Sequence, residues 1–131
     1  TENSQLAKIV DIAITPVTGA EVLTGSTRLK AGTATKMVLN MLTTGAMIKL
    51  GKVYGNLMVD VRPPNKKLVA RAKRLICQIA KTEEATAARL LKASGGNVKI
   101  AIVMHCKKVS APTAKKLLSA KKGFLGKVLD D

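Results

Sequence analysis

The stretch VLNMLTTGAMIKL, from Val38 to Leu50, is apolar on nearly every side of the helix that its spacing predicts. Large apolar residues recur at helical intervals from about Thr33 onward: Met37, Val38, Met41, Leu42 and Ile48. Such a helix needs cover on more than one side, because apolar surface is unfavourable in water. We therefore expect a buried helix within a layered fold, not a surface helix with one polar face.

A strand is predicted before this helix. The run KIVDIAITPV, from Lys8 to Val17, is rich in β-branched residues, which favour one buried strand. A buried strand, a loop and a buried helix form one repeat of an α/β layered fold. A single strand makes no sheet, so the other strands must come from residues outside this chain or from another copy of it. Together with the absence of an initiator Met, this leads us to expect a chain that begins in the middle of a domain.

The second half of the sequence predicts helices that pack on one another. Pro63 and Pro64 stop any preceding helix and suit the start of the next one. The following segment, NKKLVARAKRLICQIAK, has a single apolar stripe: Leu68, Ala72, Leu75, Ile76 and Ile79. Three short helices then follow, with Thr82, Asn97 and Ser110 as expected N-caps and the run SGG ending the first. Helices of this length are marginal alone, so we expect a compact three-helix unit.

Positive charge is concentrated in the second half. Residues 1–61 carry six Lys and Arg against four acidic residues, a net charge of +2, whereas residues 62–131 carry seventeen against four, a net charge of +13. A nucleic-acid partner is one interpretation. However, Tyr54 and Phe124 are the only aromatic residues, so a stacking platform for bases is lacking. The basic residues also fall on helix positions opposite the apolar ones, which favours a solvated lysine-rich face.

The sequence predicts neither a metal site nor a disulfide. Cys77 and Cys106 are expected to be reduced, buried small hydrophobic residues. His105 next to Cys106 does not form a metal pair, because adjacent helical residues point about 100° apart and no further ligands lie nearby. No apolar run reaches the ~18 residues of a membrane span. The N-terminus also shows no secretory signal.

The segment between the predicted strand and helix carries the strongest sign of a ligand. Within TGAEVLTGSTRLKAG, glycines allow close approach to the backbone, hydroxyl groups can donate hydrogen bonds, and Arg28 or Lys30 can add charge. The amides that begin a helix also favour an anion. This pattern suits a phosphate, carboxylate or polyhydroxylated ligand. The alternative is an ordinary capped helix with a flexible approach loop, since the segment is neither a P-loop nor a G-x-G-x-x-G motif.

The run EVLTGSTRLKAGTATKMVLNMLTTGAMIKLGKVYGNLMVDV, from Glu21 to Val61, resembles the signature region of N-acetylmuramic acid 6-phosphate etherases. AKIVDIAITPV resembles the strand before that signature, and NKKLVARAKRLICQIA and SGGNVKIAIVM resemble the family's C-terminal helices. The resemblance covers essentially the whole chain. A looser version of the motif occurs in glucokinase regulatory protein, which makes a non-catalytic phosphosugar sensor the alternative function.

The resemblance implies the fold class: an α/β chain forming the C-terminal piece of a sugar isomerase (SIS) type α/β/α parallel-sheet sandwich, followed by a small three-helix ubiquitin-associated-like domain. The chain itself is expected to be mostly helical. The expected organisation is an SIS part over residues 1–55, a connecting segment and helix over 56–81, and a three-helix domain over 82–131.

The resemblance also implies a function. The family's enzymes cleave the D-lactyl ether of N-acetylmuramic acid 6-phosphate to give N-acetylglucosamine 6-phosphate and D-lactate during cell-wall recycling. They are expected to work as cytoplasmic homodimers, without a metal or organic cofactor, a membrane partner or a nucleic-acid partner. Their catalytic glutamates lie in the first half of the SIS domain, which this chain does not match. We therefore expect no catalytic residue here, and a chain that is inactive by itself.

What carries over is the signature loop. The resemblance implies Ser26, Thr27 and Arg28 as contacts to the sugar, its lactyl carboxylate or its phosphate, with Glu21 and Lys30 as second choices. Two roles are open for Glu21: a general acid–base, or a carboxylate that orients a loop amide or the Arg28 side chain. We favour the orienting role.

Overall fold

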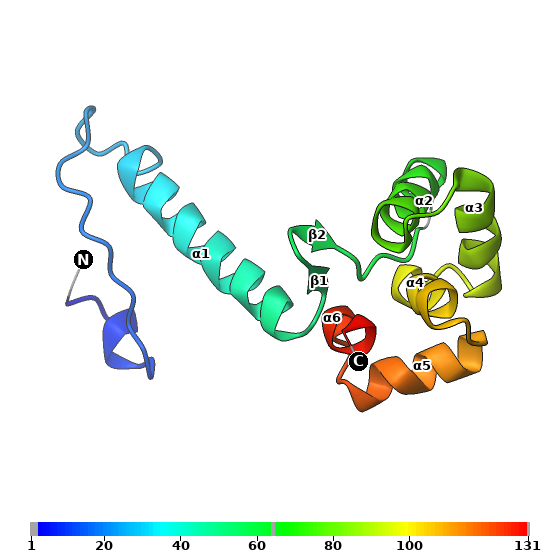
Figure 1. Ribbon diagram of the computed structural model, residues 1–131. Helices are drawn as coiled ribbons and strands as arrows, with labels where there is room; N and C mark the ends of the chain where they lie inside the picture. The colour runs from blue at the N-terminus through cyan, green and yellow to red at the C-terminus, as the bar shows by residue number, and fades with distance from the viewer. Residues whose placement is uncertain (1–2, 64, 131) are drawn as a thin grey trace. The chain divides into compact units, whose positions relative to one another are not determined.

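The structure is a computed structural model that describes residues 3–63 and 65–130, drawn as a ribbon in Figure 1. The chain divides into two compact units, Thr1–Gly45 and Ala46–Asp131. The division falls inside helix α1 (Lys30–Lys49), the longest helix of the described residues. One helix therefore belongs to both units.

The first unit lacks the strand that the sequence predicts. It contains the 3-10 helix η1 (Leu6–Lys8), then irregular chain, and then α1. The side chains of Ile9 and Ile12 are about four-fifths exposed, at 81% and 79%. The prediction of a buried strand over residues 8–17 is therefore wrong for this structure. The physical reason is that a strand is held by hydrogen bonds to a neighbouring strand, and no described residue pairs with this segment.

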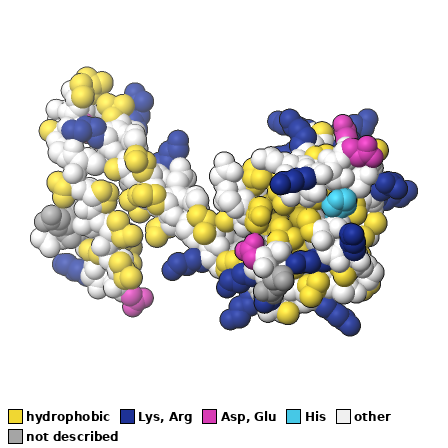
Figure 2. All heavy atoms as spheres, viewed as in Figure 1, with side chains coloured by type: hydrophobic (Ala, Val, Ile, Leu, Met, Phe, Trp, Pro, Cys, Tyr) yellow, Lys and Arg dark blue, Asp and Glu magenta, His cyan; other side chains and the backbone are white. Residues whose placement is uncertain are grey.

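Helix α1 begins at Lys30, three residues before the predicted start, and extends for 20 residues. None of its residues is buried, so the expectation that it is covered on more than one side is wrong here. Met37, Leu39 and Met41 are each more than half exposed. Figure 2 shows hydrophobic side chains along this helix in yellow. Besides α1, the described part of the first unit offers only η1 and irregular chain, which supply no second layer.

A β-hairpin follows α1 in the second unit. The sequence did not lead us to predict it. Strands β1 (Val53–Tyr54) and β2 (Leu57–Met58) pair antiparallel, with Val53 opposite Met58. Gly55 and Asn56 form the two-residue connection, and Gly55 has φ of +56°. A glycine in a two-residue turn between apolar pairs is the signal that could have predicted this hairpin.

Five helices complete the second unit: α2 (Lys66–Ala80), α3 (Glu84–Ala93), α4 (Val98–Lys107), α5 (Ala111–Ala120) and α6 (Leu125–Leu129). Helix α4 contacts each of the other four, so it lies at the centre of the bundle (Figure 1). The largest fully buried side chains are Ile76, Ile102, Leu125, Val59, Val98 and Val103. The core therefore joins the helices to the chain that follows β2.

The amphipathic helix predicted after the prolines is confirmed. Asn65 caps α2 by accepting a hydrogen bond from the Leu68 amide at 3.0 Å. Ala72, Leu75 and Ile76 of the predicted stripe are buried. Because α2 packs on both α3 and α4, it shares one core with the helices beyond residue 82. Helix α6 was not predicted.

The predicted helix ends are confirmed in part. Asn97 caps α4, with its Oδ1 accepting from the Ile100 amide at 3.0 Å. Ser110 is the N-cap of α5, as predicted, but its hydroxyl bonds to Thr113 Oγ1 and to no helix amide. The cap of α3 is Glu83, one residue after the predicted Thr82. Helix α3 ends at the SGG run, where both glycines have positive φ, as expected.

The two cysteines are free, as predicted, but differ in burial. Cys77 is half-buried, whereas Cys106 is exposed, so the prediction that both are buried is wrong for Cys106. In the described part of the chain, no helix combines the length and apolarity that crossing a membrane requires.

Candidate functional site

The approach loop, which we define as residues 18–29, is fixed to the start of α1 by one carboxylate. Glu21 Oε2 accepts a hydrogen bond from the Lys30 amide at 2.9 Å, and Oε1 accepts from the Ala31 amide at 3.0 Å. The Lys30 ammonium in turn donates to the Ala20 carbonyl at 2.9 Å. Both ends of the loop are therefore held together, although most of its residues are exposed.

This arrangement leaves no free amide at the start of the helix. The Gly32 amide donates to the Thr27 carbonyl at 2.8 Å, and the amide of Leu29, the residue before the helix, donates to the Ser26 carbonyl at 3.1 Å. All four amides that begin a helix without an internal partner are thus occupied. The prediction that helix amides are available to an anionic ligand is wrong for this structure, because the chain's own carboxylate, from Glu21, takes that place.

The hydrogen bonds to Glu21 also shape its acidity. The Ala31 amide, followed by the Lys30 amide, lowers the pKa of this carboxyl below its ordinary value, and this effect outweighs the opposing effect of burial. A carboxylate held ionised by two amides suits an orienting role better than proton transfer near neutral pH. No hydrogen bond or ion pair between Glu21 and Arg28 is formed, so the groups it orients are the helix amides.

Ser26, Thr27 and Arg28 occupy consecutive positions, and the polar groups of their side chains have no partner among the described residues. Their backbone is held in tight turns, in which the Ser26 amide donates to Leu23 and the Leu29 amide donates to Ser26, at 3.0 and 3.1 Å. Their hydroxyl and guanidinium groups form no hydrogen bond or ion pair with any described residue. Two hydroxyl donors and one cation are therefore available to a ligand, whereas Lys30 is engaged with Ala20.

A second polar cluster, in the second unit, escaped the sequence interpretation. The Lys99 ammonium on α4 lies 3.3 Å from Asp60 Oδ1, and the Lys52 ammonium lies 3.2 Å from Asp60 Oδ2. Lys99 also donates to the carbonyls of Gly123 and Gly51, at 3.2 and 3.4 Å. A lysine within the apolar run VKIAIVM was the only local signal for this cluster. Its acceptors come from distant parts of the chain.

The ion pairs set the acidity of Asp60. Burial raises the pKa of this carboxyl, but the hydrogen bond from Lys52 and the charge of Lys99 outweigh burial and bring the pKa below its ordinary value. The cluster is part of the bundle's internal structure, since the Lys99 side chain is only 11% exposed.

Comparison with known proteins finds strong similarity to one group of enzymes, although no family model matches the chain. The chain is 52% identical over 130 residues to N-acetylmuramic acid 6-phosphate etherase of Oenococcus oeni, covering 99% of this chain and 44% of that protein. For the etherase of Rhodopirellula baltica the identity is 53% over 127 residues, covering 97% of this chain and 42% of that protein. For the etherase of Photobacterium profundum the identity is 54% over 123 residues, covering 94% of this chain and 41% of that protein.

The similarity therefore extends along nearly the whole chain, including the approach loop and the helical bundle. The chain spans less than half the length of the curated relatives it matches. Identity of about one residue in two over such a length confirms the resemblance that the sequence indicates: the chain is homologous to a part of the N-acetylmuramic acid 6-phosphate etherases.

Proposed function

We propose that this chain is part of an N-acetylmuramic acid 6-phosphate etherase and supplies one wall of its sugar-phosphate site. The observation that carries the proposal is the identity of about 50% to etherases along nearly the whole chain. In the proposed reaction, D-lactate is eliminated from the sugar and water is then added, giving N-acetylglucosamine 6-phosphate. The proposed enzyme is a cytoplasmic homodimer of cell-wall sugar recycling and uses no cofactor.

The geometry of the approach loop supports its role in binding. Ser26, Thr27 and Arg28 present donors that no described residue uses, which suits a ligand rich in hydroxyl, carboxylate and phosphate oxygens. Glu21 and Lys30 act on the loop itself, by holding its two ends. We propose the first three as substrate contacts and the latter two as residues that position them.

The exposed apolar sides of α1 support the proposed sandwich. A helix with no buried residue and this many apolar side chains gains stability when a further layer covers it. The proposed organisation assigns residues 1–55 to an SIS domain, 56–81 to a connecting segment and 82–131 to a helical domain. The glutamates that act as acid and base belong, in this proposal, to a part of the enzyme that the chain does not contain. The chain alone is then inactive.

D-lactate release from N-acetylmuramic acid 6-phosphate tests this function. We would compare the chain alone with the chain joined to the part of the Oenococcus oeni etherase that it does not match. Activity in the joined protein only is the expected result. Activity in neither protein, with phosphosugar binding retained, would favour a non-catalytic sensor. Activity of the chain alone would overturn the assignment of the acid and base elsewhere, and would make Glu21 the first residue to test.

The role of the loop is tested in the joined protein by Arg28→Ala. Loss of a charge-assisted, bidentate contact to an anionic group is expected to lower kcat/KM by roughly 100-fold, mainly through KM. Arg28→Lys retains the charge without the forked geometry and should recover part of the loss. Lys49→Ala, at the other end of α1, is the matched control. An unchanged kcat/KM in Arg28→Ala would remove Arg28 from the site.

A further inference from the structure

A groove in the second unit is lined by two cations from distant parts of the chain. It has a volume of about 560 Å³, and its polar lining comes mainly from Arg62, Ser94, Asn97 and Lys115. Arg62 lies between β2 and α2, and Lys115 lies on α5. Ala93, Gly95, Ile100, Ala111 and Pro112 complete the lining. No carboxylate is among these residues.

Three side-chain groups of the groove that have no hydrogen-bond partner among the described residues are donors. Arg62 and Lys115 are exposed and form no hydrogen bond or ion pair with any described residue. Asn97 uses its Oδ1 to cap α4, which leaves its amide nitrogen facing no described acceptor. The Ser94 hydroxyl is engaged with the Leu91 carbonyl. A guanidinium, an ammonium and an amide NH₂ therefore line one groove, and none of them is bonded to a described acceptor.

No ion pair joins Arg62 or Lys115 to a carboxylate of the described residues. Asp60 is paired with Lys52 and Lys99, and Glu84 is paired with Lys73. Two positively charged side chains and no carboxylate line the groove. Electrostatics therefore favours an anionic occupant.

We propose that this groove binds the phosphate group of a small phosphorylated molecule, at a site separate from the approach loop. Its volume falls in the range of pockets for small molecules. The charged donors match the oxygens of a phosphate monoester, and Arg62 can engage two of them at once. A nucleic acid fits less well, because neither aromatic residue of the chain lines the groove and bases find no stacking surface.

Chemical-shift titration of the full chain with inorganic phosphate, glucose 6-phosphate and unphosphorylated glucose tests the proposal. Saturable shifts of the Ser94, Gly95 and Asn97 amides are expected with the first two ligands and not with glucose. Arg62→Ala and Lys115→Ala should each weaken binding about tenfold, with the fold retained by circular dichroism. Arg28→Ala should leave these shifts unchanged, which separates this site from the approach loop.

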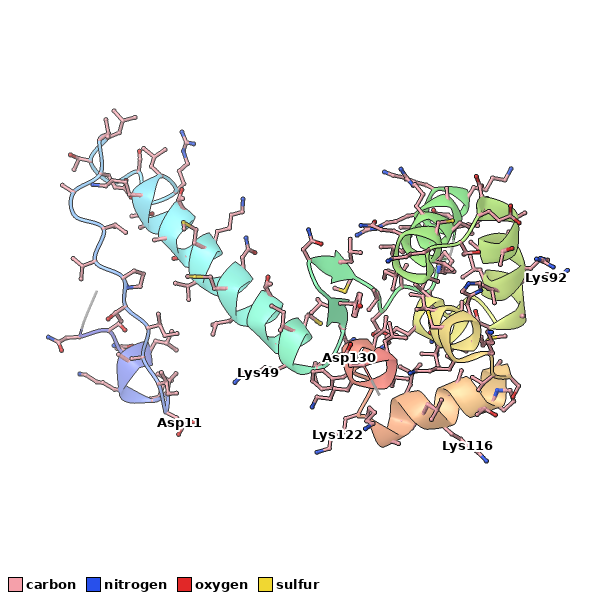
Figure 3. All side chains as sticks on the ribbon, viewed as in Figure 1. Asp11, Lys49, Lys92, Lys116, Lys122 and Asp130 are labelled. Atoms are coloured by element: carbon pink, nitrogen blue, oxygen red, sulfur yellow. The ribbon has the colours of Figure 1, made fainter. Side chains whose placement is uncertain are left out.

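Lys116→Ala is the matched control, because Lys116 neighbours Lys115 on α5 but points away from the bundle in Figure 3. It should change the affinity less than twofold. Equal losses in Lys116→Ala and Lys115→Ala would show a diffuse basic surface and overturn the proposal. So would the absence of saturable shifts, or binding of an oligonucleotide that displaces phosphate and depends on all surface lysines alike.

Discussion

The ammonium group of Lys99 lies 3.3 Å from Asp60 Oδ1 while the Lys99 side chain is only 11% exposed. The same ammonium donates to carbonyls before the hairpin and before α6, at Gly51 and Gly123. One side chain of the central helix therefore connects three segments of the second unit. Removing it leaves a partly buried carboxylate short of one partner and two carbonyls without a donor.

We expect Lys99→Ala to destabilise the second unit by about 2 kcal/mol, because an unpaired group in a partly buried site loses both its partner and its hydration. Lys99→Met keeps the apolar stem and should restore only the packing part of that loss. Tyr54, the single tyrosine, belongs to this unit and reports its urea unfolding by fluorescence. Lys92→Ala is the control at an exposed site on α3, where Figure 3 shows the side chain pointing away from the bundle. A loss no larger than that of the control would exclude the connecting role of Lys99.

The lowered pKa of Asp60 predicts how stability depends on pH. Because the folded pKa is below the unfolded value of about 4, the stabilisation is fully present above that value and is lost as pH falls through the folded pKa. Asp60→Asn should therefore be less stable than the parent at neutral pH and lose less stability on acidification. Urea unfolding between pH 7 and pH 2 measures both. Parallel pH profiles would contradict this prediction.

Glu84 serves as the comparison for that experiment. Its pKa is lowered by the hydrogen bond and charge of Lys73, so Glu84→Gln shifts the acid profile in the same direction. Because the Glu84 side chain is 75% exposed, against 31% for Asp60, its effect on the profile should be the smaller one.

Two glycines should respond to alanine in opposite ways. Gly51 has φ of +67°, and a Cβ there would lie 3.1 Å from the Phe124 ring, so Gly51→Ala is expected to cost about 2 kcal/mol. Gly45 lies within α1 with nothing within 4 Å of a Cβ, so Gly45→Ala should gain roughly 0.5–1 kcal/mol of helix stability. Tyrosine fluorescence follows the first change and the helical circular dichroism signal follows the second. A neutral Gly51→Ala would show that the close approach to Phe124 is easily relieved.

Lysine at a left-handed helix end predicts a stabilising substitution. Lys108 ends α4 with φ of +52°, a conformation that glycine adopts without the steric cost of a Cβ. Lys108→Gly should raise the unfolding free energy by roughly 0.5–1 kcal/mol. Lys116→Gly, in the middle of α5, should lower it by about 1 kcal/mol. The same sign for both variants would refute the argument from backbone conformation.

The orienting role of Glu21 predicts a local change in hydrogen exchange. Glu21→Gln retains one oxygen acceptor but loses the charge that binds the Lys30 and Ala31 amides. These two amides should exchange roughly fivefold faster with solvent. Asp11→Asn, an exposed acid of the same unit, is the control and should leave them unchanged. Unaltered exchange in Glu21→Gln would return the acid–base role to consideration.

Features encoded by neighbouring residues could be predicted from the sequence. The stripe of α2, the Asn97 cap and the glycine end of α3 each depend on residues within a few positions of one another. The run from Lys8 to Val17 shows the opposite case. Its β-branched residues favour an extended chain, but a strand forms only where a second strand supplies hydrogen bonds, and no described residue does so.

Local sequence rules single out residue types for the candidate site but do not specify its geometry, and the binding role of those residues stays a prediction. Ser26, Thr27 and Arg28 stand out by residue type, and in the structure their side chains form no hydrogen bond or ion pair with a described residue. Which group occupies the helix amides depends on Glu21 folding back across nine residues, and local sequence rules do not specify that return. Lys99 was missed for the same reason, since its partners at 51, 60 and 123 meet only in the folded bundle.

Because α1 is divided between two units, its two ends should unfold at different stages. Its last turn is fixed by the Gly51 and Lys52 amides, which donate to the carbonyls of Ile48 and Met47, and its last residues belong to the second unit. Its first turns belong to a unit in which no described residue is buried. A helix grows more easily from an existing turn than from a new one. Unfolding of α1 should therefore begin at Lys30 and proceed turn by turn toward Lys49. Refolding should proceed in the opposite direction, so that the approach loop regains its structure last.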